Sequence, residues 1–197
     1  MAILLNDNGY KYVLNWNPSN NNLEVLKYGL TTFDYASGEY LKTLVDTSTI
    51  SALQWGSWYD TTDQMAPIAG TATAMLCNSG YGEGITKVSN KDFQVTYPGK
   101  YNLQFSAQLD QNSASAHRAF IWFRKNGVDE PYSASEVAIQ GSLAEAVPSW
   151  NYIFDLNAGD YVNVMWSVTN TDVILRAKAP AGVVPGIPSI IITMWKL

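Results

Sequence analysis

The sequence of 197 residues contains one cysteine and one histidine, and these scarcities exclude several kinds of site. A single Cys77 allows no disulfide bond within the chain, so we expect the chain to be made and folded in a reducing cytoplasm. Cys77 lies in the apolar segment TATAMLCN, which predicts a small buried side chain and not a nucleophile. His117 follows the polar segment DQNSASA, which predicts a solvated loop residue without ligand-spaced partners for a metal.

Charge is also scarce, because charged residues make up 15% of the sequence and the net charge is −5. No cluster of Lys and Arg is longer than two residues, so we expect no nucleic-acid binding. The longest apolar runs are too short for a membrane span, which predicts no membrane insertion. The first ten residues, MAILLNDNGY, contain no basic segment, so we expect no signal peptide.

Carboxylates occur in pairs at two places, but neither pair suggests chemistry. Asp60 and Asp63 flank two threonines, which predicts a turn in which the Asp side chains bond local backbone. Asp129 and Glu130 precede Pro131 in a predicted loop and are expected to be solvated. Calcium needs about six or more oxygen ligands, and the glycines form no phosphate loop. The sequence therefore predicts no catalytic residue, no metal site and no cofactor.

What the sequence does contain is a frequent alternation of apolar and polar residues, with helical periodicity nearly absent. In YNLQFSAQL (101–109) the alternate residues from Tyr101 to Leu109 form one apolar face, and DYVNVMWSV (160–168) does the same from Val162 to Val168. SWNYIFDL (149–156), DFQVTY (92–97) and SIIITMW (189–195) also predict strands. Segment 133–147 has the spacing of a helix capping box, but Gly141 interrupts it, so we expect a strand and a loop. Regular turn signals between these segments are typical of an all-β sandwich.

The segment AFIWFRKNG (119–127) departs from alternation, because four apolar residues follow one another. Such a strand needs cover on both faces. We expect Ile121 and Phe123 to face the core of the sandwich, and Phe120 and Trp122 to emerge on its outer face. A neighbouring subunit, the N-terminal segment or another protein would then cover Phe120 and Trp122.

The first fifty residues are rich in aromatic residues but show no sustained alternation. A segment of this length and pattern is too small to bury a core alone, and it is too aromatic for a solvated linker. We therefore expect an extended N-terminal arm (1–50) that anchors on another protein, followed by a knob domain (51–197). The expected anchoring residues are Tyr10, Tyr12, Trp16, Tyr28, Phe33 and Tyr35.

From residue 51 onward the order of strands and turns resembles the tumour-necrosis-factor-like jelly roll, the fold of the globular heads of complement. YPGKYNLQFSAQL resembles the Pro-Gly-x-Tyr entry into its third long strand, and FIWFRKNG follows where that fold has its next strand and a basic turn. FDLNAGDYVNVMW resembles its Leu-x-x-Gly-Asp-x-Val hairpin, and SIIITMW its closing strand. Five segments in order also resemble a domain of phage structural proteins, including those of marine and cyanobacterial phages: YDTTDQ, YNLQFSAQLDQ, IWFRKNGVDEPYS, SWNYIFDL and PGIPSIIIT.

The resemblance implies a ten-strand jelly-roll sandwich that assembles as a homotrimer on a virion surface and is not an enzyme. Two roles remain open. The protein is either a capsid decoration or head-fibre protein attached to the capsid shell by its arm, or a tail-fibre tip that recognises a host surface glycan. The sequence before residue 51 has no heptad run or repeat for a stalk, which favours decoration. A secreted complement-like or cytokine-like ligand is disfavoured, because no signal peptide, disulfide or glycosylation sequon is expected.

Overall fold

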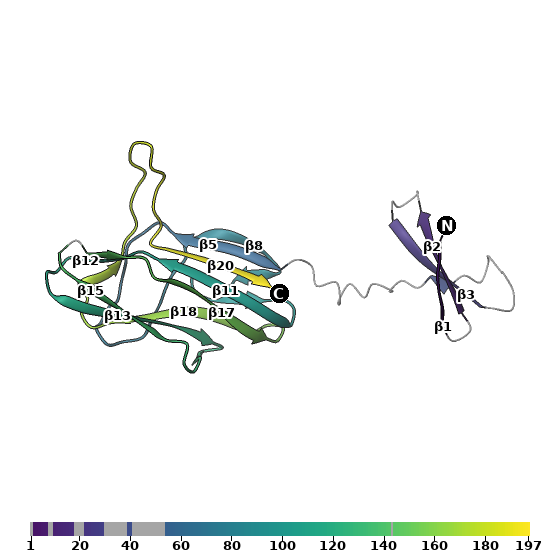
Figure 1. The fold of residues 1–197 in the computed structure, drawn as a ribbon, viewed down its shortest axis with the longest axis horizontal. Coiled ribbons are helices and arrows are strands. Elements are labelled where there is room, and N and C mark those ends of the chain that lie inside the picture. Colours follow the sequence, from purple (N-terminus) through teal and green to yellow (C-terminus); the bar gives the residue numbers. More distant parts are fainter. Residues whose placement is uncertain (1, 8–9, 18–21, 30–38, 41–53, 143) are drawn as a thin grey trace. The chain divides into compact units, whose positions relative to one another are not determined.

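The computed structural model describes residues 2–7, 10–17, 22–29, 39–40, 54–142 and 144–197, and its regular elements are all β-strands. The chain divides into two compact units, Met1–Ala52 and Leu53–Leu197 (Figure 1). This division lies close to the predicted boundary between arm and knob.

The first unit contains a four-stranded antiparallel sheet in the order β1 (Ala2–Asp7), β2 (Tyr10–Asn17), β3 (Asn22–Gly29) and β4 (Glu39–Tyr40). The irregular side-chain pattern predicted no regular structure here. Pairing between neighbouring strands uses backbone groups, which do not depend on alternation, and aromatic residues favour strands. Four of the expected anchoring residues lie on β2 and β3: Tyr10, Tyr12, Trp16 and Tyr28. The other two, Phe33 and Tyr35, lie outside the described residues.

The second unit is a sandwich, and its first layer is a five-stranded antiparallel sheet. The strand order is β17 (Ser149–Leu156), β11 (Gly99–Ala107), β20 (Ile190–Lys196), β5 (Trp55–Asp60) and β8 (Ser79–Glu83). The central strand β20 pairs with β11 and β5, which lie much earlier in the sequence, so this sheet depends on long-range contacts.

The second layer is a seven-stranded sheet with the order β14 (Val128–Asp129), β13 (Ala116–Lys125), β18 (Tyr161–Val168), β10 (Phe93–Val95) and β9 (Ile85–Lys87). In addition, β15 (Ser135–Gln140) pairs with β13, and β7 (Thr73–Ala74) pairs with β18. The described residues of 54–197 thus form a layer of five strands and a layer of seven, and β7 and β14 of the second layer have only two residues each. The remaining ten strands confirm the predicted ten-strand jelly-roll sandwich.

A small four-stranded sheet continues the sandwich at one end, in the order β16 (Glu145–Ala146), β12 (Leu109–Gln111), β19 (Val173–Leu175) and β6 (Gln64–Met65). Strands β15 and β16 lie within segment 133–147, and Gly141, which follows β15, has a φ of 102°. The predicted strand and loop are therefore confirmed for this segment.

The core lies between the two layers and follows the predicted alternation. Every second residue from Tyr101 to Leu109 is at most 1% exposed, and so is every second residue from Val162 to Val168. Phe123 of β13 connects the layers, because its ring lies 5.9 Å from Phe105 and 5.8 Å from Phe154 between centroids. Edge-to-face contacts of this kind add about 0.5–1.5 kcal/mol beyond their area burial.

Trp58 of β5 is buried, and glycines leave room for its indole. A Cβ built on Gly80 would lie 2.3 Å from the Ser57 carbonyl oxygen and 2.5 Å from the Trp58 Cα. Gly80 also has a φ of 123°, a backbone conformation that residues other than glycine rarely adopt. The position therefore carries both a steric and a conformational requirement.

We predict that Gly80→Ala lowers the free energy of unfolding by about 3 kcal/mol or more, since backbone atoms must move. Gly141→Ala is the matched control, because Gly141 has a φ of 102° but no heavy atom within 4 Å of its built Cβ. Its loss should be about 1 kcal/mol. Urea unfolding followed by tryptophan fluorescence measures both values, and equal losses would contradict the steric argument.

Candidate interaction surface

Cys77 is fully buried, which confirms the predicted small buried side chain. Burial raises the pKa of its thiol to about 12, and the nearby carboxylate of Asp60 adds to the shift. The nucleophile in thiol chemistry is the thiolate. A thiol that stays protonated and inaccessible at neutral pH has no role as a nucleophile.

His117 is not the solvated loop residue that the sequence predicted. It lies on β13 opposite Ile139, on the same side of the strand as Ala119 and Ile121. The side chain is half-buried, and its Nε2 is buried without a hydrogen-bond partner among the described residues. The prediction failed because β13 begins at Ala116, earlier than the polar composition of the preceding segment suggested.

Asp60 and Asp63 have different roles, although the sequence predicted the same one for both. Asp60 Oδ1 accepts hydrogen bonds from the Thr62 amide (2.8 Å) and the Thr62 hydroxyl (2.5 Å), which confirms the local turn. Asp63 instead bonds a distant segment, since its Oδ1 accepts from the Ala177 amide at 2.8 Å and its Oδ2 from Arg176 Nη1 at 2.7 Å. The local reading of Asp63 was wrong, because its partners lie far away in the sequence.

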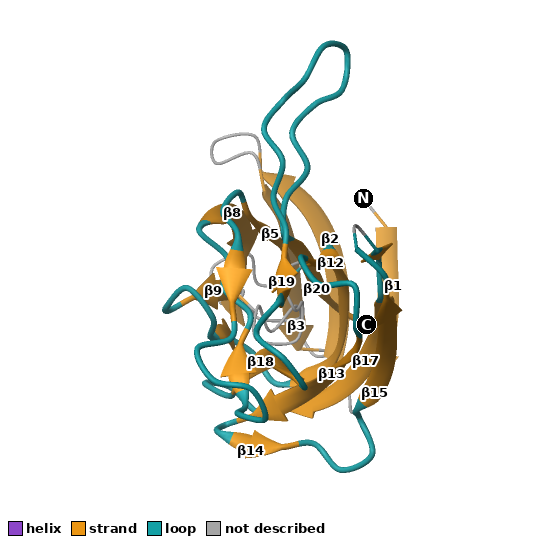
Figure 2. Ribbon diagram, turned by 90° about the vertical axis from the view of Figure 1, so that its left-hand side faces the viewer, coloured by secondary structure: helices purple, strands orange, loops and turns teal. Residues whose placement is uncertain are grey.

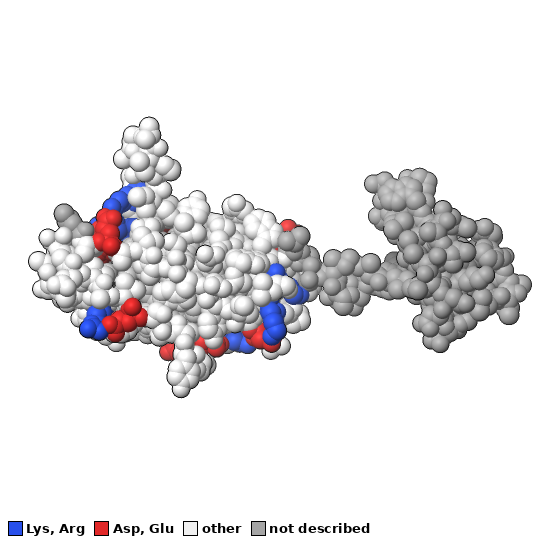
Figure 3. Space-filling model, in the orientation of Figure 1, with Lys and Arg blue, Asp and Glu red and all other residues white. Residues whose placement is uncertain are grey.

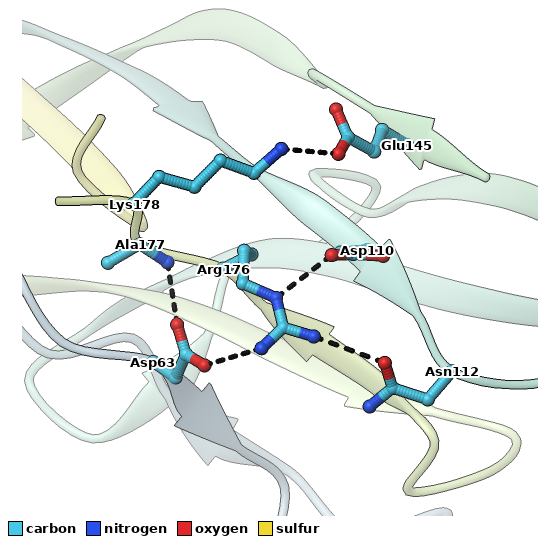
Figure 4. Close-up of polar contacts among 7 residues, drawn as sticks. All are labelled: Asp63, Asp110, Asn112, Glu145, Arg176, Ala177 and Lys178. Carbon is cyan, nitrogen blue, oxygen red and sulfur yellow. Dashed lines mark hydrogen bonds and ion pairs between the residues drawn. The ribbon is translucent and has the colours of Figure 1, made fainter. Parts of the chain in front are cut away.

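Figure 4 shows the polar contacts around Arg176. We call Arg176 together with Asp63, Asp110, Asn112 and the Ala177 amide the Arg176 cluster. Besides Asp63, its guanidinium donates from Nε to Asp110 Oδ2 at 2.9 Å and from Nη2 to Asn112 Oδ1 at 3.1 Å. The bond to Asp110 and the charge of Asp63 raise the pKa of Arg176 above its ordinary value. Three segments thus meet on one side chain directly after β19, which makes the cluster a structural anchor.

The outer face of the seven-stranded sheet carries Phe120 and Trp122, while Ile121 and Phe123 are fully buried as predicted. Both Phe120 and Trp122 are half-buried within the chain itself. Trp122 Nε1 donates to Asp129 Oδ1 at 2.7 Å, and Arg124 Nε donates to the same oxygen at 2.7 Å. A further ion pair joins Arg118 to Glu136. We call this side the ion-paired face, and a partner contact at Phe120 and Trp122 stays a prediction.

The outer face of the five-stranded sheet has a different character. Its outward positions on β5, β20, β11 and β17 form rows across the sheet, such as Tyr59 beside Ile191 and Ser57 beside Thr193. At one end of this face Lys100 of β11 and Asp155 of β17 form an ion pair of 2.9 Å. The other outward positions of these four strands are uncharged, and we call them the neutral face: Trp55, Ser57, Tyr59, Asn102, Gln104, Ser106, Ser149, Asn151, Ile153, Ile191, Thr193 and Trp195. Charged side chains gather toward the ends of the sandwich in Figure 3 and leave uncharged surface between them.

A groove of about 570 Å³ opens where the neutral face meets the chain between β19 and β20. This chain forms a hairpin, residues 178–187, that projects from the sandwich (Figure 2). Ser57, Tyr59 and Ile191 line the groove from the sheet, and Pro180, Gly186 and Ile187 line it from the hairpin. We call these two features the corner groove and the projecting hairpin. The one charged residue in the lining is Lys178, whose Nζ pairs with Glu145 at 2.5 Å.

The sequence contained a signal for the neutral face that its analysis did not use. SIIITMW is apolar on both sides of the strand, so one of its sides had to lie outside the core. The polar side of YNLQFSAQL consists of Asn, Gln and Ser, with no charge. These two strands are neighbours in the sheet, but only the pairing of β11 with β20 shows it.

The side chains of this surface are mainly aromatic, aliphatic and uncharged polar groups. Among the described residues, no group of three or more His, Cys, Asp and Glu is placed to hold a metal ion. Within the same residues, no helix is long and apolar enough to cross a membrane. The neutral face and the corner groove offer hydroxyl, amide and aromatic groups, which suit contact with another macromolecule.

The likeness of this chain to known proteins is one of fold. No family model matches the sequence, and comparison with curated proteins gives no match. The crystal structure of murine APRIL at pH 5.0 is 12% identical with a TM-score of 0.46, over 74% of this chain and 100% of that chain. The globular domain of the zebrafish complement 1qA protein is 13% identical with a TM-score of 0.46, over 74% of this chain and 98% of that chain. Likenesses at this level do not bear on partners or chemistry.

The contact of Asp129 predicts an acid-dependent contribution to stability. Hydrogen bonding by Arg124, with a second bond from Trp122, lowers the pKa of the Asp129 carboxyl. A carboxyl with a lowered pKa in the folded state stabilises the fold above its unfolded pKa, and this contribution is lost as the pH falls through the folded pKa. At pH ~6 the free energy of unfolding of wild type should therefore exceed that of Asp129→Asn. The difference should be no more than about 1 kcal/mol, because the Asp129 side chain is exposed. The difference should shrink as the pH falls below the ordinary pKa of an Asp side chain, and a difference that does not depend on pH in this range would contradict this origin.

Proposed function

We propose that this chain is a non-enzymatic structural protein of a phage particle, whose knob domain forms a homotrimer through the neutral face. The neutral face is the observation that carries the assembly. Tyr59, Ile191 and Trp195 are 39%, 40% and 37% exposed there, among uncharged polar neighbours. Interface cores are depleted of charge and enriched in aromatic residues. Burying the ion-paired face would instead desolvate several charges, which is costly.

The jelly-roll architecture supports three copies in the assembly. Tumour-necrosis-factor-like and complement-head domains typically form homotrimers, and the two layers of this chain form the ten-strand sandwich that the resemblance implied. An outward sheet face in which apolar and uncharged polar groups alternate can meet an equivalent subunit without burying an unpaired charge. The trimer therefore uses a surface that the fold leaves available.

The role in a virion rests on the five sequence segments that resemble a phage structural domain. Residues 1–52 form a compact unit of their own, which supports a separate task for them. We propose that this unit attaches the knob to the capsid shell, so that the protein decorates the head. It would be made in the bacterial cytoplasm and reside on the virion surface.

The corner groove favours a second candidate, a tail-fibre tip that recognises a host surface glycan. Its volume of about 570 Å³ lies within the range of small-ligand sites, roughly 300–1,000 Å³. Tyr59 supplies an aromatic ring against which a sugar could stack, and Ser57 and Thr61 supply hydroxyl groups beside it. The two candidates differ in whether the protein is needed for adsorption to host cells.

The assembly is tested with a charge placed on the neutral face. Thr193→Asp should shift the full chain from trimer to monomer at micromolar concentration, because three carboxylates would be buried in one assembly. Thr86→Asp, at an exposed position of β9, is the matched control and should leave the trimer intact. Sedimentation equilibrium measures both, and wild type should remain trimeric at high salt, which screens surface charge pairs. A monomeric wild type would refute the proposed assembly.

The attachment is tested by deleting residues 1–50. We expect a folded, trimeric knob that no longer associates with particles, since the proposed attachment is made by the first unit and not by the knob. For a head decoration, particles without the protein should adsorb to host cells at near wild-type rates, whereas for a receptor-binding tip adsorption should collapse. Knobs that lack residues 1–50 yet still bind particles would contradict the anchoring role.

A further inference from the structure

The projecting hairpin exposes apolar residues to an unusual extent. Nine consecutive residues, 178–186, are exposed, and residues 179–187 include no charged or polar side chain. At the tip, Val183 is 101% exposed and Val184 is 51% exposed. Contiguous exposed apolar surface on a soluble protein marks an interaction site. The hairpin therefore requires a partner that its own sandwich does not supply.

The hairpin is held in one conformation before it meets a partner. Lys178 and Ile187 exchange two backbone hydrogen bonds of 2.8 Å, and Ala181 and Val184 exchange two of 3.1 and 3.0 Å. Gly182, with a φ of 61°, begins the two-residue turn between Ala181 and Val184. At the base, the Arg176 cluster fixes the chain through the Ala177 amide. A rigid element loses less conformational entropy on binding.

The sequence of the hairpin also limits how a partner can bind it. Pro180 and Pro185 lie between the two bridged pairs, one on each side of the ladder. Proline has no amide N–H, so neither edge presents a continuous row of donors to an added strand. Recognition by strand addition is thereby blocked. The contact must be made by side chains, chiefly those of valine, proline and isoleucine.

We propose that the projecting hairpin is a clasp between copies of this chain: the hairpin of one subunit lies on the neutral face of the next. This inference rests on the homotrimer proposed above. The hairpin and the neutral face are joined through the corner groove, which both of them line. A copy seated on the neutral face therefore meets the hairpin that rises beside it (Figure 1).

The area available on the neutral face supports a second copy as the partner of the hairpin. Four large side chains on this face are 37–54% exposed: Tyr59, Ile153, Ile191 and Trp195. A whole aromatic side chain has about 150–250 Å² of surface, so together these four expose on the order of 300 Å² of apolar surface. A stable interface buries roughly 800 Å² per partner, somewhat over half of it apolar. The neutral face alone falls short of this. The hairpin adds further exposed apolar side chains, Val183 and Val184 among them, beside this face.

Charge and symmetry agree with this pairing. Neither the neutral face nor residues 179–187 of the hairpin carries a charged residue, so their contact buries no unpaired charge. Hairpin and face are different surfaces of one chain, so the contact is heterologous, and such contacts form a ring when the rotation closes. In a closed trimer every hairpin is covered and every face is occupied.

A photo-crosslinking experiment on the full chain tests the clasp. The residue p-benzoylphenylalanine is placed at position 183, and a mixture of normal and heavy-isotope protein is irradiated. We expect crosslinks between copies that map to the outward positions of β5, β20, β11 or β17. The same residue at position 128, also exposed at 71%, is the matched control and should give no crosslinks between copies. Crosslinks from position 183 that stay within one copy, or that fall on the ion-paired face, would overturn the proposal.

A shortened hairpin provides a second test. Replacing residues 179–186 by Asn-Gly leaves the Lys178–Ile187 pair joined by a two-residue turn. The dissociation constant of the trimer should rise at least about tenfold, as expected for losing hot-spot contacts. The double variant Val183→Asp/Val184→Asp should act in the same direction without shortening the chain. Its matched control, Val88→Asp/Val128→Asp, changes two other exposed valines and should have no effect.

The outcomes separate the clasp from the assembly on which it rests. A trimer whose dissociation constant is unchanged by both hairpin variants would overturn the clasp and leave the homotrimer standing. A wild-type chain that is monomeric would overturn both. A trimer that weakens in both variants, with an unchanged melting temperature of the separated monomers, would support the clasp.

Discussion

Strand β20 must be covered on both sides, and much of the sandwich is arranged around that requirement. Ile190, Ile192 and Met194 are fully buried against the second layer. Ile191, Thr193 and Trp195 point the other way, where the chain provides only neighbours in the same sheet. Because β11 and β5 flank β20 on either side, its outward row lies at the centre of the neutral face. Residues 190–195 of this central strand carry no charge, which favours burial of both its sides.

The aromatic side chains on the two outer faces of the sandwich have different neighbours. On the ion-paired face, the carboxylate of Asp129 binds both Trp122 and Arg124 and holds them against the sheet. On the neutral face, Trp55 packs edge-to-face on Tyr81 at 5.5 Å, and the ion pair of Lys100 with Asp155 lies at the end of the β11 and β17 rows. Charged groups hold water strongly and resist removal from it. The first face is thus suited to solvent, and the second to a protein partner.

The sequence allowed the sandwich to be predicted where its signals are local. Alternation along 101–109 and 160–168 depends on neighbouring residues only, and the buried faces of β11 and β18 follow from it. Contacts between distant segments could not be predicted in this way. Asp63 finds Arg176 only when β6 pairs with β19, and His117 joins a strand only through its pairing with β15. The segment between β19 and β20 is rich in proline and glycine, which predicts a loop, and the contact between Asp63 and the Ala177 amide at its base joins residues far apart in the sequence.

The burial of Cys77 determines how the folded chain responds to oxidising surroundings. Exposed thiols on crowded neighbours oxidise to intermolecular disulfides when the surroundings change from reducing to oxidising. Here the sulfur is fully enclosed, and its pKa of about 12 leaves almost no thiolate to react. The folded chain can therefore move from reducing to oxidising surroundings with its thiol unchanged, and copies of it at high concentration are not crosslinked through Cys77.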